Sequence, residues 1–196
     1  MIYSLSPAPP TQSRQSWSHL KTHLSRLDKD DFLLLLHDLY ALNADNKVFL
    51  ATRFFAATPD EMAAPYRRII QQVFNPDRGM PSLQLGAARK ALNEFKKACA
   101  DPLLVIDFML FYVEQGVTCT NSYGDIDAPF YQSLFSVYRD AAELTRHLAN
   151  PALIEQFRPR FTKIIRDLSN VGWGIQDAMV ETYWDRLPET ENGLAS

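Results

Sequence analysis

Three short motifs that begin helices recur along the chain, and they restrict its fold more than any other feature. In "TPDE" (residues 58–61) the threonine can cap a helix, the proline suits the first helical position, and the glutamate can bond back to the cap amide. "DP" at 101–102 and "NP" at 150–151 repeat the combination of a cap and a proline. Alternating runs rich in Val, Ile and Thr, typical of strands, are missing. The pattern predicts an all-α protein.

Apolar residues recur at intervals of three and four between these motifs, which indicates amphipathic helices. Pro159 interrupts one such run, so we expect a short helix or a kink before Phe161. The last helix should follow "NVGWG" (170–174). Its inward-facing residues should be Ile175, Met179, Tyr183 and Trp184.

The segment after Pro102 is the most apolar part of the chain and contains "LLVIDFMLFYV" (103–113). Its apolar residues nearly encircle a helix, so we expect that helix at the centre of the fold, ending near Gly116. The run is too short to span a bilayer and contains Asp107. The beginning of the chain also lacks the basic and apolar regions of a secretory signal. We therefore expect a cytoplasmic protein without a membrane segment.

The whole pattern predicts eight to nine helices with short connections. They would form either an irregular bundle or a stack of helix pairs resembling an α–α superhelix. A length of 196 residues suits one domain. We expect this single all-helical domain at residues 14–187, after a disordered segment at 1–13 and before a frayed tail at 188–196.

The stretch "TNSYGDIDAPFY" (120–131) is either a joint between helices or a polar site. As a joint it begins with a loop after Gly116, and Asp127 caps the next helix. That interpretation leaves Asn121, Tyr123 and Asp125 unexplained. They lack the spacing of a calcium-binding loop.

A tryptophan between two glycines, "GWG" (172–174), can be an exposed plate that binds a partner or a plug in the core. If it lies near the polar joint, the two segments could line one ligand pocket. The candidate ligand-binding residues are Tyr112, Glu114, Asn121, Tyr123, Asp125 and Trp173.

Charge is unevenly distributed along the chain. Residues 65–99 carry seven basic and two acidic side chains, whereas residues 100–196 carry seven basic and fourteen acidic ones. Five basic residues could form one patch for phosphates: Arg67, Arg68, Arg78, Arg89 and Lys90. The acidic balance of the whole chain and the shortage of stacking aromatics between these residues disfavour nucleic acid as the partner.

Motifs for chemistry are scarce. The chain has no Gly-rich nucleotide loop, no G-x-S-x-G elbow and no Glu-x-x-His pair. His19 and His23 share a helix face, but no further metal ligand is identifiable. Cys99 and Cys119 lie in apolar segments and should be small buried thiols. We therefore predict no metal and no cofactor, while the catalytic residues, if the chain is an enzyme, stay unknown.

Several of these stretches together resemble a bacterial family known only as a domain of unknown function. They are "LHDLYALNADNKVFL" (36–50), the segment 88–131 that contains "NSYGDIDAPFY", and "GWG" (172–174). The resemblance runs from about residue 18 to 187. It implies a compact all-helical domain that stands alone, and it carries no activity or catalytic residue to this chain.

The sequence thus favours a non-catalytic interaction or scaffold protein with an unidentified protein partner. One alternative is an enzyme or a protein that binds a small molecule or metal through the pocket near residues 112–127 and Trp173. The other is nucleic-acid association through residues 65–99. The sequence does not determine the oligomeric state.

Overall fold

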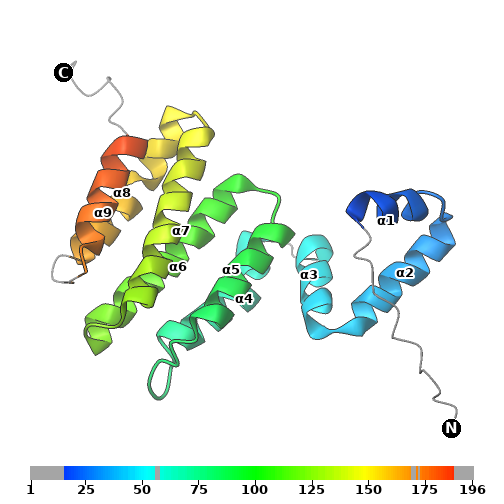
Figure 1. The fold of residues 1–196 in the computed structure, drawn as a ribbon, viewed down its shortest axis with the longest axis horizontal. Coiled ribbons are helices and arrows are strands. Elements are labelled where there is room, and N and C mark those ends of the chain that lie inside the picture. Colours follow the sequence, from blue (N-terminus) through cyan, green and yellow to red (C-terminus); the bar gives the residue numbers. More distant parts are fainter. Residues whose placement is uncertain (1–15, 56–57, 169–170, 172, 188–196) are drawn as a thin grey trace, which may run out of the picture. The chain divides into compact units, whose positions relative to one another are not determined.

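A computed structural model describes residues 16–55, 58–168, 171 and 173–187. These residues form nine helices and no strand, so the prediction of an all-α protein is confirmed (Figure 1). The helices are α1 (Trp17–Leu24), α2 (Lys29–Leu42), α3 (Ala44–Phe55), α4 (Pro59–Phe74), α5 (Leu85–Ala98), α6 (Pro102–Tyr123), α7 (Ala128–His147), α8 (Pro151–Asp167) and α9 (Ile175–Arg186). The segments predicted to be disordered (1–13) and frayed (188–196) lie outside the described residues.

The chain divides into two compact units, residues 1–47 and 48–196, where the sequence suggested one domain over 14–187. The first unit contains α1, α2 and the start of α3, and none of the residues of α1 or α2 is buried. The second contains the end of α3 and all of α4 to α9, together with the hydrophobic core of the described residues.

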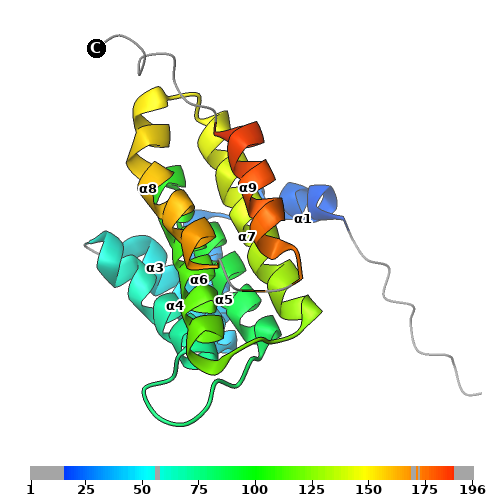
Figure 2. The ribbon, with the colours of Figure 1, turned by 90° about the vertical axis from the view of Figure 1, so that its left-hand side faces the viewer.

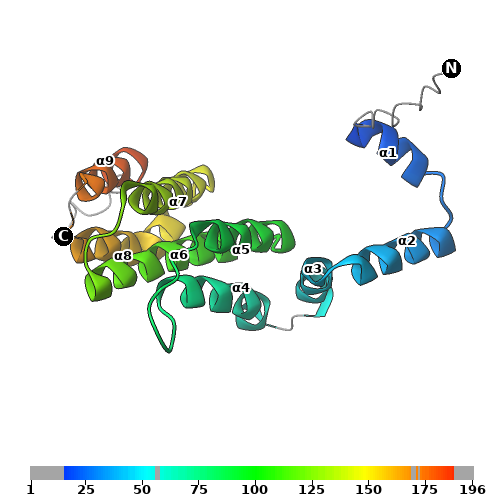
Figure 3. The ribbon, with the colours of Figure 1, turned by 60° about the horizontal axis from the view of Figure 1, so that its bottom comes forward.

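The second unit stacks three helix pairs: α4 with α5, α6 with α7, and α8 with α9. Figure 3 shows α4, α6 and α8 in one layer and α5, α7 and α9 in the other. α6 contacts α4, α5, α7 and α8, and therefore has the central position that its apolar sequence predicts. Of the two predicted arrangements, this unit adopts the stack of helix pairs.

One helix of the described residues, α6, is long and apolar enough to cross a membrane when judged by length and composition alone. With 22 residues it extends beyond the apolar run seen in the sequence. Of its apolar window, 61% is buried by the rest of the protein, as expected for the core helix of a folded domain.

The helices begin at the predicted caps. Thr58 Oγ1 accepts a hydrogen bond from the backbone N–H of Glu61 at 3.2 Å. Asp101 and Asn150 accept one from the N–H two residues ahead, at 2.8 and 3.0 Å. Proline occupies the first turn of all three helices. Each cap satisfies a backbone donor that the helix itself leaves free.

The predicted end of the central helix near Gly116 is wrong, because α6 continues to Tyr123. A Cβ atom on Gly116 would lie 2.3 Å from Leu134 Cδ2 on α7, so glycine at this position permits a close approach of two helices. The helix ends instead at Gly124, whose φ of 90° is in the region that favours glycine. The joint to α7 is therefore only residues 124–127.

Two further expectations about the C-terminal half need correction. α8 runs through Pro159 as one helix of 17 residues, so the short helix before Phe161 is wrong, and the alternative of a kink stays a prediction. Trp184 faces outward and is 55% exposed, unlike Met179 and Tyr183, which are buried. The reason is helical spacing: Trp184 lies about 100° around the helix from Tyr183.

Candidate functional site

The polar joint and the "GWG" segment, 48 residues apart in sequence, meet at one carboxylate. Asp125 Oδ1 accepts a hydrogen bond from the Tyr131 hydroxyl at 2.7 Å. The indole Nε1 of Trp173 donates to both oxygens of Asp125, at 3.1 and 3.0 Å. Asp125 therefore ties the start of α9 to the start of α7.

The same joint fixes the direction of α7. Asp127 Oδ1 accepts a hydrogen bond from Phe130 N–H at 2.9 Å, which confirms Asp127 as the predicted cap. Tyr131, one turn into α7, also accepts from Ile126 N–H at 3.2 Å and lies 2.6 Å from Thr120 Oγ1. The hydroxyl of Tyr131, which donates to Asp125, therefore has three hydrogen-bond partners: Asp125, Ile126 and Thr120.

The surroundings of Asp125 and Tyr131 keep both groups in their ordinary protonation states. The hydrogen bond from Tyr131, followed by that from Trp173, lowers the pKa of Asp125. Burial, with an added effect of Asp125, raises the pKa of Tyr131. At neutral pH the carboxylate is therefore ionised and the phenol protonated.

Trp173 has a backbone conformation that is rare for a bulky side chain. Its φ is 66°, in the left-handed region, and Gly174 has the same φ directly before α9. Its ring lies tilted toward that of Tyr131, with centroids 6.4 Å apart, and its side chain is 59% exposed. Such strain persists only where surrounding contacts hold it, here the bonds to Asp125.

A cleft of about 180 Å³ lies beside Trp173, between α7 and α9. The two helices run side by side in Figure 2. Its lining includes the large apolar residues Tyr131, Phe135, Trp173 and Ile175, together with Gln132. Sites for drug-sized molecules have roughly 300–1,000 Å³. The volume of this cleft suits one large side chain.

Of the six candidate pocket residues, Asp125 and Trp173 meet here. Glu114 and Asn121 line a different cleft, of about 310 Å³, between α6 and α8. There the Asn121 side-chain amide donates to the carbonyl of Asp167 at 3.1 Å, and Asp167 forms an ion pair with Lys163. The predicted pocket therefore combined residues that line two separate clefts.

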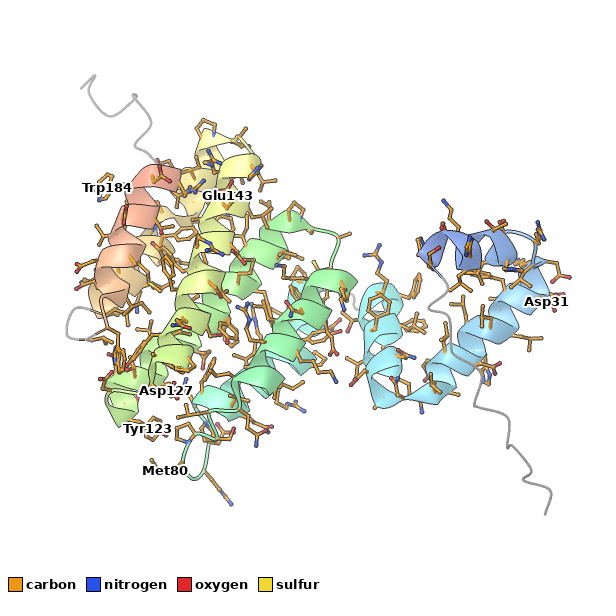
Figure 4. All side chains as sticks on the ribbon, in the orientation of Figure 1. Asp31, Met80, Tyr123, Asp127, Glu143 and Trp184 are labelled. Atoms are coloured by element: carbon orange, nitrogen blue, oxygen red, sulfur yellow. The ribbon has the colours of Figure 1, made fainter. Side chains whose placement is uncertain are left out.

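The remaining two candidates line neither cleft. Tyr112 is buried in the core, where its hydroxyl lies 2.8 Å from Ser133 Oγ. Tyr123 is exposed at the end of α6, close to Asp127 in Figure 4. The sequence did not identify Phe135 or Gln132 as cleft residues, although Phe135 lies one helical turn after Tyr131.

An ion-pair network that the sequence did not reveal joins α4, α6 and α8. Arg160 Nε donates to Glu114 Oε1 at 2.7 Å, and its Nη1 donates to Asp107 Oδ1 at 2.6 Å. Arg67 Nη2 donates to Asp107 Oδ2 at 2.8 Å. Burial disfavours the charged form of Arg160, but Glu114 and Asp107 outweigh it and raise its pKa. These carboxylates are bound to guanidinium groups, so the network holds helices together.

The five residues predicted as one basic patch have different surroundings. Arg67 contacts carboxylates on α4 and α6. Arg89 donates to a serine hydroxyl on α7 at 3.1 Å, and Lys90 lies 3.6 Å from a glutamate one turn later. Arg68 and Arg78 are exposed. Three of the five residues, Arg67, Arg89 and Lys90, thus already have hydrogen-bond or ion-pair partners within the protein.

The described residues contain no group of three His, Cys, Asp or Glu side chains that could hold a metal ion. Cys99 and Cys119 are buried free thiols, as predicted. Burial raises the pKa of Cys119 to about 11, so this thiol is protonated at neutral pH.

The comparisons with known proteins identify a family and no activity. A family model described as a family of unknown function, DUF6155, matches residues 15–187. Neither a curated protein nor a solved structure matches the chain. The match covers most of the sequence, and the chain therefore belongs to the DUF6155 family of unknown function.

Proposed function

We propose that this chain is a non-catalytic interaction protein, whose cleft between α7 and α9 binds one apolar side chain of a protein partner. The observation that carries the proposal is Trp173: an exposed aromatic ring, in a strained backbone conformation, fixed by Asp125 at the edge of a mostly apolar cleft. Rigid, amphipathic aromatic rings of this kind are enriched where proteins bind each other.

Binding fits the chemistry of the cleft better than catalysis. A general base needs a pKa near the working pH. The carboxylate of Asp125 already accepts three hydrogen bonds, which lower its pKa. The hydroxyl of Tyr131 is bonded on three sides and has a raised pKa. Both groups serve to orient Trp173.

The charge near the cleft favours a basic partner segment. Asp125, Asp127 and Asp177 are exposed and lie in the two loops and helix starts that form the cleft. Opposite charge around an apolar centre increases the association rate and selects the partner. We therefore propose a partner segment with a large apolar residue beside lysine or arginine. The cytoplasmic location expected from the sequence remains part of this proposal.

The test is an affinity pull-down from lysate of the protein's own host, with and without nuclease. The chain offers a matched pair of variants, Trp173→Ala and Trp184→Ala. Both tryptophans are exposed, and Trp184 lies at the other end of α9 from the joint marked by Asp127 in Figure 4.

The proposal predicts a protein that survives nuclease, binds wild type and Trp184→Ala equally, and is lost with Trp173→Ala. Added salt should weaken the capture. A partner that binds both variants equally would exclude the cleft. Partners that disappear with nuclease would favour nucleic-acid association through residues 65–99.

A further inference from the structure

The cleft between α6 and α8, of about 310 Å³, is not used by the function proposed above. The two helices are neighbours in one layer of the stack (Figure 3). They are joined at both ends of the cleft: Arg160 binds Glu114 at one end, and Asn121 donates to the carbonyl of Asp167 at the other. On each helix these positions are about two turns, or roughly 10 Å, apart. The volume between the two contacts falls within the range of small-molecule sites, roughly 300–1,000 Å³.

The lining of this cleft combines apolar and polar side chains. Val117 and Ile164 are buried, at 4% and 1% exposure, and supply apolar contact area. Thr118 and Lys163, their neighbours in sequence, are exposed. A molecule that fits this lining has an apolar face for Val117 and Ile164 and polar groups along its edge.

The three charged groups that line the cleft are already paired. Both oxygens of Glu114 accept hydrogen bonds from Arg160, at 2.7 and 2.8 Å. Asp167 forms an ion pair with Lys163, and the hydrogen bond from Lys163 lowers the pKa of Asp167. A charged molecule would have to break one of these pairs or enter without a counter-charge, and both cost free energy. The cleft therefore favours an uncharged molecule.

The same side chains retain hydrogen-bonding capacity. The Lys163 ammonium has three N–H groups, of which Asp167 takes one. The hydroxyl of Thr118 donates to the carbonyl of Glu114 at 2.9 Å, so its oxygen can still accept a bond. The Asn121 amide uses one N–H toward Asp167, and its side-chain oxygen remains an acceptor. The cleft thus offers both donors and acceptors.

We propose that this cleft binds a small, uncharged polyhydroxyl compound of the monosaccharide class. Each hydroxyl of such a compound can both donate and accept, which matches the mixed lining. One C–H face of its ring would lie against Val117 and Ile164. The site shares no residue with the cleft beside Trp173, so the inference does not rest on the proposed function.

The test is a titration of the isotope-labelled full chain with D-glucose and D-ribose, followed by amide chemical shifts. Molecules of this size should bind with a Kd on the order of 1 mM. The shifts should centre on residues 114–121 and 160–167. D-glucuronate and D-glucosamine, at mildly acidic pH where the amine is protonated, carry a charge on the same ring as glucose. Both should bind at least about tenfold more weakly than glucose.

Three variants place the binding in this cleft. Thr118→Phe fills the cleft from its exposed edge and should abolish binding. Thr162→Phe, at an exposed position of α8 outside the lining, is the matched control and should bind as wild type does. Lys163→Met removes the lysine from Asp167, and D-glucosamine should then bind at least about fivefold more tightly than it binds the wild type. This variant keeps the test decisive if Thr118→Phe folds poorly, which the amide spectrum would reveal.

Absence of shifts in the cleft at about 50 mM of either neutral sugar would overturn the proposal. Unchanged binding by Thr118→Phe would do the same, and so would equal affinities for glucose and its two charged analogues. Trp173→Ala should bind glucose as wild type does, so that loss of sugar binding and loss of the protein partner are separate results.

Discussion

Replacing Gly116 with alanine tests how closely α6 and α7 approach each other. The new Cβ atom would lie 2.3 and 2.7 Å from the two Cδ atoms of Leu134 and 3.0 Å from its Cγ. Leu134 is fully buried, so its whole side chain has to shift within a packed core. The contact therefore acts as overpacking.

Two opposing effects set the magnitude. Overpacking a core position costs about 1–3 kcal/mol of unfolding free energy. Alanine in a helix interior is better than glycine by about 1 kcal/mol. The net expectation for Gly116→Ala is a loss on the order of 1 kcal/mol.

Urea unfolding with linear extrapolation measures this change. Gly86→Ala is the matched control: Gly86 lies in α5, and a Cβ there meets nothing within 4 Å, so this variant should be neutral or slightly more stable. In a Leu134→Ala background, Gly116→Ala should no longer be destabilising, because the colliding atoms are gone. If Gly116→Ala stabilises the wild type as much as Gly86→Ala does, the close helix contact is wrong.

Other sites give sharp expectations. Because the folded-state pKa of Asp125 lies below its usual value of 3.8, its charge stabilises the fold above that pH and the contribution is lost on acidification. Asp125→Asn should therefore lower the Tm at neutral pH, and the difference from wild type should shrink as the pH falls below 3.8; a difference that stays constant on acidification would contradict this. Arg160→Met leaves the part-buried Glu114 unpaired and Asp107 with Arg67 alone, and should cost about 2 kcal/mol in urea unfolding, while Arg139→Met, at an exposed pair, should change stability by less than about 0.5 kcal/mol. If Arg160→Met and Arg139→Met lower the free energy of unfolding by similar amounts, the ion-pair network around Arg160 does not stabilise the fold as proposed. Cys99 and Cys119 have raised pKa values and are buried, so a thiol reagent at mildly alkaline pH should label neither until the chain unfolds. Rapid labelling of the native protein would contradict their burial.

The helix starts could be predicted from sequence because each cap is a local arrangement. Thr58 and Glu61 interact across one turn, and the same holds for Asp127 and Phe130. Such a contact depends on few residues and little on the rest of the fold. The all-α class follows from many local signals of this kind.

Glycine is a weaker signal because it has two uses in a helix. It can end the helix, as Gly124 does, or permit another helix to come close, as Gly116 does. The choice for Gly116 depends on Leu134, 18 residues later, whose position the local sequence does not contain.

The candidate site depends even more on distant contacts. The sequence identified Asp125 and Trp173 as candidate ligand-binding residues, but their hydrogen bond spans 48 positions. The packing of α9 on α7 brings them together. The same packing separates both from Glu114, which sequence proximity to the joint had grouped with them.

Site-specific photo-crosslinking in living host cells tests the central proposal most directly. A photoreactive phenylalanine analogue at Gln132 would sit in the wall of the cleft, and the same analogue at Trp184 provides the control. The cleft should yield one crosslinked protein, joined through an apolar residue next to lysine or arginine, that is absent from the control. No crosslink at Gln132, or the same product at both positions, would contradict the proposal that a protein partner occupies this cleft.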